Sequence, residues 1–172
     1  VKIKVNGSEF LFFNDITIAL TLDAVASAFS FTGRFNPNNT IHRQLFKPLS
    51  YPKIELFKDD GTLLLTGTLL NQSPTSTAEP NLVTLSGYSK AGVLEDCNIP
   101  LSSYPLESLN RSLTEITTRL IQLFGVSLKV APNVSKSANA VYTKTTAEPT
   151  DSIAGYISKL AAQRNIVVSH DN

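Results

Sequence analysis

The spacing of apolar residues changes part-way along the chain, and this change constrains the fold more than any other feature. Up to about Tyr88 the apolar residues follow the two-residue alternation of strands that bury one face. From Leu94 onward they recur at helical spacing. The sequence therefore predicts a mainly β first domain over residues 1–92 and a small α/β module over residues 93–172.

Turn-forming residues divide the first domain into short antiparallel strands. Asn6-Gly7 predicts a tight hairpin with its return strand at 10–13, because both residues accept positive φ. Asp59-Asp60-Gly61 predicts another turn, before a strand at 63–70. Six or so strands with such turns favour a barrel or a sandwich.

Three segments of the first domain need a choice between alternatives. Residues 15–35 are rich in β-branched and aromatic side chains and are predicted as strand, although several alanines allow a helical reading of the middle. Residues 36–52 contain three prolines and are predicted as a long loop that still carries apolar side chains. Gly67 interrupts a strand, which indicates a bulge or a close approach of two backbones.

The second half contains clear helix signals. Ser112 and Glu115 have the spacing of a capping box at the start of a helix. Gly125 follows this apolar helix at the position where a residue in the left-handed conformation ends a helix. A second helix is predicted after Thr150 or Asp151, with its apolar face over 153–161. Short strands are predicted at 126–130 and 166–168. The last of these ends on a turn without a partner strand, so we expect the natural protein to continue.

Composition argues against several classes of protein. Lys plus Arg number 15 against 14 Asp plus Glu, so the chain lacks the basic excess of a nucleic-acid-binding protein. Cys97 is the single cysteine, and His42 and His170 are far apart, so we predict no disulfide, metal site or cofactor. No signal peptide and no apolar run of membrane-spanning length is visible.

No residues predict catalysis. Ser169, His170 and Asp171 are the three residue types of a hydrolytic triad, but they are consecutive. Consecutive residues of an extended segment cannot take the hydrogen-bonded geometry that a catalytic triad needs. The acidic pair before Cys97 more simply precedes a buried thiol. The carboxylates that a hydrolase needs offer no paired spacing, whether taken from Asp15, Asp23, Glu55 or Glu79. The sequence therefore predicts a protein that is not an enzyme.

Several short motifs occur in an order that resembles one family. Leu65-Thr-Gly67 precedes Gly87-Tyr-Ser-Lys90 and Leu94-Glu-Asp-Cys97, and the helix signals at 106–126 and 148–164 follow. This order resembles the baseplate hub family of contractile phage tails, which includes the hub of Mu-like phages and the late control protein D family. Ala147-Glu-Pro departs from the Gly-Glu-Thr that the family often has there.

The resemblance implies an architecture and a set of partners. It implies a tube-protein-like β-barrel followed by an α/β module that is incomplete at its C-terminus. Such hubs resemble trimers that form a pseudo-six-fold ring, join the tail tube to the central spike, and surround a channel through which DNA passes without specific binding. The expected partners are therefore two further copies, the tube protein, the spike protein and other baseplate proteins. The expected location is the virion baseplate, after synthesis in the host cytoplasm.

Four apolar residues are the candidate contacts with neighbouring subunits. They are Phe35, Ile41, Leu45 and Phe46, on or beside the predicted long loop. The alternative is that they plug one end of their own barrel. Other functions also remain open: a β-rich binding module, the spike base of a type VI secretion-like system, and a cell-wall hydrolase fragment. Loss of activity on peptidoglycan after mutation of one carboxylate would support the hydrolase.

Overall fold

The computed structural model describes residues 1–22, 24–75 and 81–171. Contacts between residues group the chain into two compact units. The first unit comprises Val1–Thr21 and Ala26–Lys90, with Asp171 joining it, and the second comprises Leu22–Val25 and Ala91–His170. Each unit encloses a hydrophobic core of its own.

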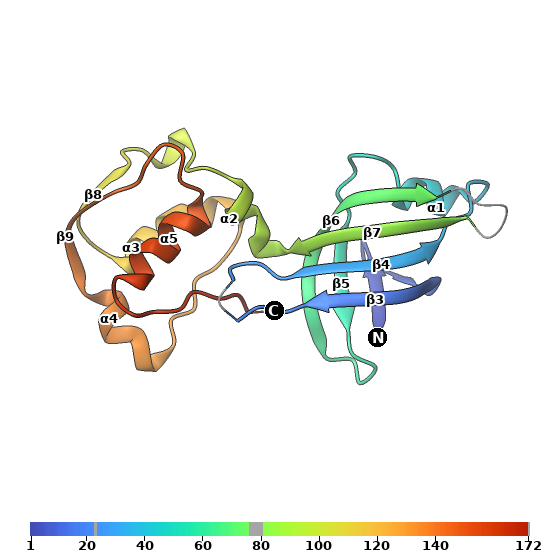
Figure 1. Ribbon diagram of the computed structural model, residues 1–172, viewed down its shortest axis with the longest axis horizontal. Coiled ribbons are helices and arrows are strands. Elements are labelled where there is room, and N and C mark those ends of the chain that lie inside the picture. The colour runs from blue at the N-terminus through green and yellow to red at the C-terminus, as the bar shows by residue number, and fades with distance from the viewer. Residues whose placement is uncertain (23, 76–80, 172) are drawn as a thin grey trace. The chain divides into compact units, whose positions relative to one another are not determined.

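Seven antiparallel strands form one sheet in the first unit (Figure 1). The strands are β1 (Lys2–Val5), β2 (Ser8–Phe10), β3 (Phe13–Ala19), β4 (Ala28–Arg34), β5 (Lys53–Phe57), β6 (Leu63–Thr75) and β7 (Leu82–Ser89). Their order across the sheet is β2-β1-β5-β6-β7-β4-β3. The predicted fold class, a mainly β, barrel-like domain followed by a smaller α/β part, is confirmed, with the barrel present as a curled half-barrel sheet.

The sheet curls into a half-barrel, because its two outermost strands are neighbours in the chain. Only Leu11 and Phe12 separate the end of β2 from the start of β3, although these strands lie at opposite edges of the sheet. The amide of Arg34, at the end of β4, donates a hydrogen bond of 2.8 Å to the Phe12 carbonyl oxygen. A Cβ on Gly33 would lie 2.9 Å from the Phe10 ring. The end of β2 therefore lies against β4, near the opposite edge.

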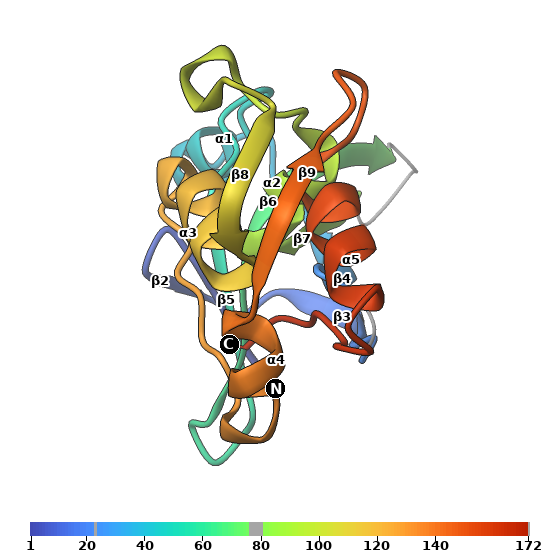
Figure 2. The ribbon, with the colours of Figure 1, turned by 90° about the vertical axis from the view of Figure 1, so that its left-hand side faces the viewer.

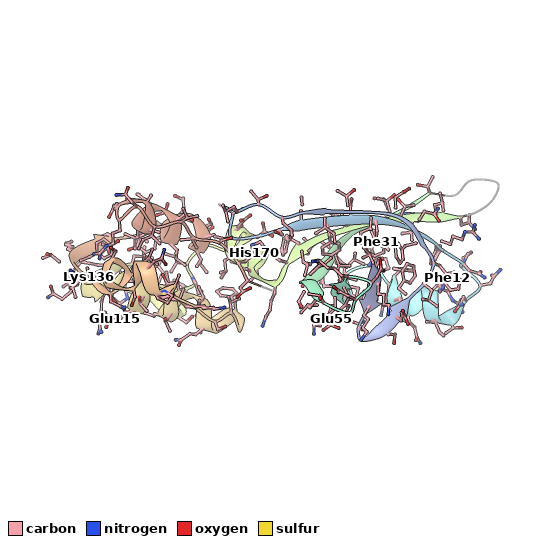
Figure 3. The ribbon with its side chains drawn as sticks, turned by 90° about the horizontal axis from the view of Figure 1, so that it is seen from below. Phe12, Phe31, Glu55, Glu115, Lys136 and His170 are labelled. Carbon is pink, nitrogen blue, oxygen red and sulfur yellow. The ribbon has the colours of Figure 1, made fainter. Side chains whose placement is uncertain are left out.

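Alternation along the strands fills the inside of this curve. β1 buries Ile3 and Val5 completely, while Lys2 is exposed. Phe31 of β4 is buried in the same core and is labelled in Figure 3. The buried set is Ile3, Val5, Phe10, Phe29, Phe31, Phe46, Ile54, Leu56, Leu65, Leu69, Val83 and Leu85.

The predicted hairpin at Asn6-Gly7 is confirmed. Asn6 has φ 48° and Gly7 has φ 82°, which places Val5 opposite Ser8. The prediction of the return strand at 10–13 is wrong, since β2 is Ser8–Phe10 and residue 13 already begins β3. A two-residue turn lets the return strand start at once, which the apolar run at 10–13 did not indicate.

The segment 15–35 contributes to two strands that pair with each other, β3 and β4. The strand prediction is confirmed for these parts and wrong for the residues between them. The described residues of that connection, 20–22 and 24–27, are neither strand nor helix. Val25 explains the break, because it is buried in the core of the second unit.

β6 and β7 approach each other closely at two glycines. A Cβ on Gly67 would lie 2.3 Å from the Tyr88 carbonyl oxygen, and one on Gly87 would lie 2.0 Å from that of Thr68. The close approach predicted at Gly67 is therefore confirmed. The irregularity in pairing lies slightly further on, between Leu69 and Asn71.

The second unit packs helices against a two-stranded sheet (Figure 2). Its elements are α2 (Val93–Asp96), β8 (Glu107–Ser112), α3 (Leu113–Ile121), α4 (Ser135–Asn139), β9 (Val141–Thr146) and α5 (Ile153–Ala162). Short 3-10 turns occur at Lys90–Gly92, Leu101–Ser103, Gln122–Phe124 and Pro132–Val134. β8 and β9 are antiparallel, with Leu109 opposite Lys144.

Two strands predicted in this unit are wrong. Residues 126–130 and 166–168 have no strand structure. Val126, Ile166 and Val168 are half-buried and pack against the helical core instead. Their apolar side chains thus cover the core without pairing, whereas the polar segments 107–112 and 141–146 form the actual sheet.

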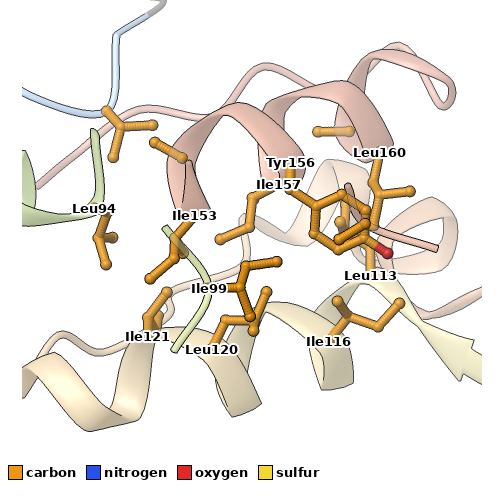
Figure 4. Packing of buried hydrophobic residues seen from close by; sticks show 14 residues of the cluster. Leu94, Ile99, Leu113, Ile116, Leu120, Ile121, Ile153, Tyr156, Ile157 and Leu160 are labelled. Carbon is orange, nitrogen blue, oxygen red and sulfur yellow. The ribbon is translucent and has the colours of Figure 1, made fainter. Parts of the chain in front are cut away.

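α3 and α5 form the core of the second unit (Figure 4). Leu120 of α3 and Ile153 of α5 are fully buried, and Tyr156 is 2% exposed. The hydroxyl of Tyr156 donates to Thr145 Oγ1 at 3.0 Å, and that of Tyr142 donates to the Leu160 carbonyl oxygen at 2.7 Å. These two bonds attach β9 to α5.

The predicted helix ends are confirmed for α3 and corrected for α5. Ser112 and Glu115 form the complete capping box, and Gly125 has φ 62°. The cap of α5 is Ser152, whose Oγ accepts from the Gly155 amide, so the prediction of Thr150 or Asp151 is wrong. The Asp151 carboxylate instead accepts from the Glu148 amide and closes the preceding turn.

We expect Ser112→Ala to lower the free energy of unfolding of the second unit by about 1 kcal/mol, because the Glu115 amide loses its acceptor. Urea unfolding followed by circular dichroism measures this difference. Thr118→Ala, at an exposed position of α3, is the control and is expected to change little. Equal effects of the two variants would contradict the capping role.

The capping box of Ser112 and Glu115 also predicts that the free energy of unfolding depends on pH. Hydrogen bonds from the Ser112 amide and from Arg111 hold the pKa of the Glu115 carboxyl below its usual value. A lowered pKa in the folded state gives stability that is present above the unfolded-state pKa and lost as the pH falls through the folded-state pKa. Glu115→Gln should therefore reduce the loss of unfolding free energy at acid pH. An unfolding free energy with the same pH profile in this variant as in the wild-type chain would contradict this role of Glu115. Glu115 is labelled in Figure 3.

Candidate assembly surface

A short helix interrupts the predicted long loop at 36–52 and shapes one surface of the first unit. α1 (Thr40–Leu45) begins after Asn39, whose side-chain oxygen accepts from the amides of Ile41 and His42 at 2.9 and 3.4 Å. The Asn36 amide donates to Nδ1 of His42 at 3.1 Å. These side-chain bonds supply a cap and a tether, so a loop rich in asparagine forms one helical turn.

Aromatic rings hold α1 on the sheet. Phe46 meets Phe10 edge-on at a centroid distance of 5.6 Å and Phe35 at 6.1 Å. The His42 ring lies 6.2 Å from both Phe12 and Phe46. The sequence did not indicate this role for His42, since a lone histidine on a loop has no distinctive spacing.

The structure places the four candidate contact residues in different environments. Phe46 is buried in the sheet core, and Phe35 and Leu45 are half-buried against it. Ile41 is 64% exposed. Three of the four therefore pack within their own unit, and Ile41 is the one whose side chain is mainly available to another molecule.

Two further apolar residues were missed. Leu49 and Tyr51 are 80% and 52% exposed, and their φ values are 60° and 44°. Large side chains rarely adopt this left-handed conformation, and such strain concentrates at functional sites. The prolines at 48 and 52 that bracket them were the available signal in the sequence.

A groove lies beside these two residues. It has a volume of about 460 Å3, and its lining includes Phe46, Leu49, Tyr51, Leu70 and Pro74. The far half of β6 lines it, because β5 ends its pairing with β6 at Lys53 opposite Thr68. From residue 71 to Thr75, β6 pairs with β7 alone among the described strands. An unpaired strand edge of this kind invites another chain.

The segment that carries these exposed apolar residues is positively charged. Residues 34–53 contain Arg34, Arg43, Lys47 and Lys53 and no Asp or Glu. Lys53 forms an ion pair of 2.6 Å with Glu55. The other three side chains are in exposed positions. We call the six exposed residues Arg34, Ile41, Arg43, Lys47, Leu49 and Tyr51 the α1 surface.

Several of the residues considered for catalysis lie in the part of the chain that the structure describes. His170 Nδ1 lies 3.4 Å from the Ala24 carbonyl oxygen, and Cys97 is half-buried. Asp23 and Glu79 lie outside the described residues. Over the part of the chain that the structure describes, no three His, Cys, Asp or Glu side chains are grouped so that they hold a metal ion. None of the helices in that part is long and apolar enough to cross a membrane.

Solved structures share this fold. The 43 kDa tail protein of prophage MuSo2 from Shewanella oneidensis superposes with a TM-score of 0.80 over 99% of this chain, at 21% identity. The tail protein from Neisseria meningitidis MC58 superposes with a TM-score of 0.69 over 93% of this chain, also at 21% identity. These structural neighbours are phage tail proteins.

A third neighbour comes from a related machine. The E. coli c3393 protein, a type VI secretion system component described as similar to the T4 bacteriophage tail proteins gp27 and gp5, has a TM-score of 0.60 over 95% of this chain at 9% identity. The chain spans 50% of the Shewanella protein, 44% of the Neisseria protein and 43% of the E. coli protein. No protein-family model and no curated protein matches the sequence. At these identities the likeness establishes the fold.

Proposed function

We propose that this chain is a structural protein of a phage tail, and specifically part of the baseplate hub. The observation that supports it most is the agreement of fold with a phage tail protein over 99% of the chain at a TM-score of 0.80. The order of motifs from Leu65 to Arg164 supports the same family independently of the fold. The proposed role is assembly, without catalysis.

The proposed hub is a homotrimer that forms a pseudo-six-fold ring between the tail tube and the central spike. Residues 1–92 form the tube-like domain and 93–172 the α/β module. The ring surrounds the DNA channel, and its other partners are the tube, spike and baseplate proteins. The protein is made in the host cytoplasm and resides in the virion baseplate. Phe35, Ile41, Leu45 and Phe46 remain the proposed contact segment, with Ile41 as its exposed member.

A second candidate is the spike base of a type VI secretion-like system. The similarity to the E. coli c3393 protein favours it, because that protein is a component of such a system. Antibody labelling distinguishes the two functions: label at the baseplate of released phage particles supports the hub, and label on cell-bound secretion structures supports the alternative. Label on neither would return the chain to the class of β-rich binding modules.

The solution mass tests the ring. We expect size-exclusion chromatography with light scattering to give about three times the chain mass of 18.7 kDa. A monomer at micromolar concentration, unchanged by added spike protein, would contradict the hub.

Ile41→Asp is expected to weaken this association without unfolding the chain, because the side chain is 64% exposed. Solvent-exposed substitutions change the free energy of unfolding by about 0.5 kcal/mol or less. Light scattering measures the association, and thermal unfolding checks the fold. Leu109→Asp, at a site 55% exposed in the second unit, is the matched control. A trimer that persists in the Ile41→Asp variant would show that Ile41 is not a contact.

A further inference from the structure

The second unit carries a surface whose charge is opposite to that of the α1 surface. Glu95 and Asp96 lie in α2 and are exposed, and Glu148 and Asp151 lie in the turn before α5. We call these four residues the acidic surface. Residues 91–98 and 147–158 contain no Lys or Arg.

Backbone contacts hold the two acidic segments together. The Ile153 amide donates to the Cys97 carbonyl oxygen at 3.0 Å, and Asn98 pairs with Ser152. The Asp151 carboxylate accepts from the Glu148 amide at 2.9 Å, which fixes the turn. The four carboxylates therefore belong to one rigid part of the second unit, and their positions do not depend on a mobile loop.

The α1 surface has the complementary composition. Arg34, Arg43 and Lys47 are exposed, and none of them is within ion-pair distance of a carboxylate among the residues that the structure describes. The only side-chain hydrogen bond of the three in that part of the chain joins Arg43 to Thr40 Oγ1 at 3.3 Å. Ile41 and Leu49 belong to the same segment, residues 34–53, and are mainly exposed. A partner that neutralises this surface must be acidic and must cover apolar side chains.

We propose that the α1 surface of one copy docks on the acidic surface of a second copy of this chain. The inference rests on the proposed assembly into a ring and names the contact that builds it. Charge complementarity is the argument: the α1 surface presents three exposed cations, and the acidic surface presents the exposed carboxylates of Glu95, Asp96 and Glu148. Leu101, which is 83% exposed, follows α2 in the chain by a few residues and is an exposed apolar side chain of the second unit.

This contact has a direction. Each copy uses two different surfaces, so each bound copy leaves one α1 surface and one acidic surface for further copies. Such a head-to-tail contact continues until the ring closes, whereas a contact between identical surfaces stops at a dimer. The docking is also expected to weaken with salt, because the charges are screened over about 10 Å at 0.1 M ionic strength.

Charge reversal tests the contact. The self-association constant of the full chain is measured by analytical ultracentrifugation at low and high salt. We expect Arg43→Glu and Glu148→Lys each to weaken self-association by about tenfold at low salt. Lys136→Glu reverses an exposed charge outside both surfaces and is the matched control, with no expected effect; Figure 3 labels this residue.

Recombining the variants makes the test specific. The chain that carries both Arg43→Glu and Glu148→Lys has its charges exchanged, and we expect it to regain a large part of the lost association. Single variants as weak as the Lys136→Glu control, or a double variant no stronger than either single one, would overturn this contact while leaving a hub ring possible. A wild-type chain that stays monomeric would overturn both the contact and the ring. Antibody labelling of tail particles tests the tail location separately.

Discussion

Gly87→Ala is expected to destabilise the first unit by about 3 kcal/mol or more, at the upper end of the cost of overpacking. The added Cβ would lie 2.0 Å from the Thr68 carbonyl oxygen and 2.8 Å from the Phe29 ring. The oxygen belongs to the backbone of β6, so relief requires that two paired strands separate. The side chain of Phe29 cannot move aside easily either, because it is 3% exposed in the core.

Thermal unfolding followed by far-ultraviolet circular dichroism measures this effect. Ser86→Ala, at the adjacent half-buried position of β7, is the matched control and is expected to cost far less. Amide cross-peaks of α3 and α5 should remain native in both variants, because those helices have a separate core. If Gly87→Ala were as stable as Ser86→Ala, the close approach of β6 and β7 would be wrong.

Leu120→Ala is expected to cost 2–5 kcal/mol, the usual range for truncating a fully buried leucine. Leu120 is 0% exposed and lies between α3 and α5 in the core of the second unit.

Leu123→Ala is the matched control for that core. Leu123 follows α3 and is 52% exposed, so its truncation should change the free energy of unfolding by about 0.5 kcal/mol or less. Urea denaturation followed by the amide cross-peaks of α3 and α5 reports on this unit. Equal destabilisation by the two variants would show that the helical packing is not as described.

Local patterns predicted the parts of the fold whose structure is set by neighbours in sequence. The Asn6-Gly7 hairpin and the Ser112–Glu115 capping box depend on residues a few positions apart, and both are confirmed. Strand pairing over long distances is different. β8 has a polar sequence and becomes a strand because β9 lies about 30 residues further on, a partner that no local pattern reveals.

The reverse error has the same origin. The apolar residues at 126–130 and 166–168 satisfy the composition of strands, yet they cover the helical core without a strand partner. Hydrophobicity alone reports burial, and burial does not determine whether a backbone pairs. The predicted alternation held where a sheet was long enough to bury one whole face, as in β1 and β7.

The candidate surface was predictable only in part. The sequence predicts a long loop with apolar side chains at 36–52. It does not indicate that Phe46 is buried in the core while Ile41 is exposed. Leu49 and Tyr51 required backbone angles, and the acidic surface required the pairing of Asn98 with Ser152. These properties arise from tertiary contacts, so only the structure reveals them.

The strand order also sets when the first unit becomes a single body during synthesis. β7 is the last strand of the first unit to leave the ribosome and the one that joins β6 to β4. Before residues 82–89 emerge, the nascent chain has only two separate ribbons, β2-β1-β5-β6 and β4-β3, each with an open edge. A ribosome that pauses after β6 has emerged, while β7 is still inside the exit tunnel, would prolong that exposed state, so slow translation at this stage should lower the yield of folded protein most.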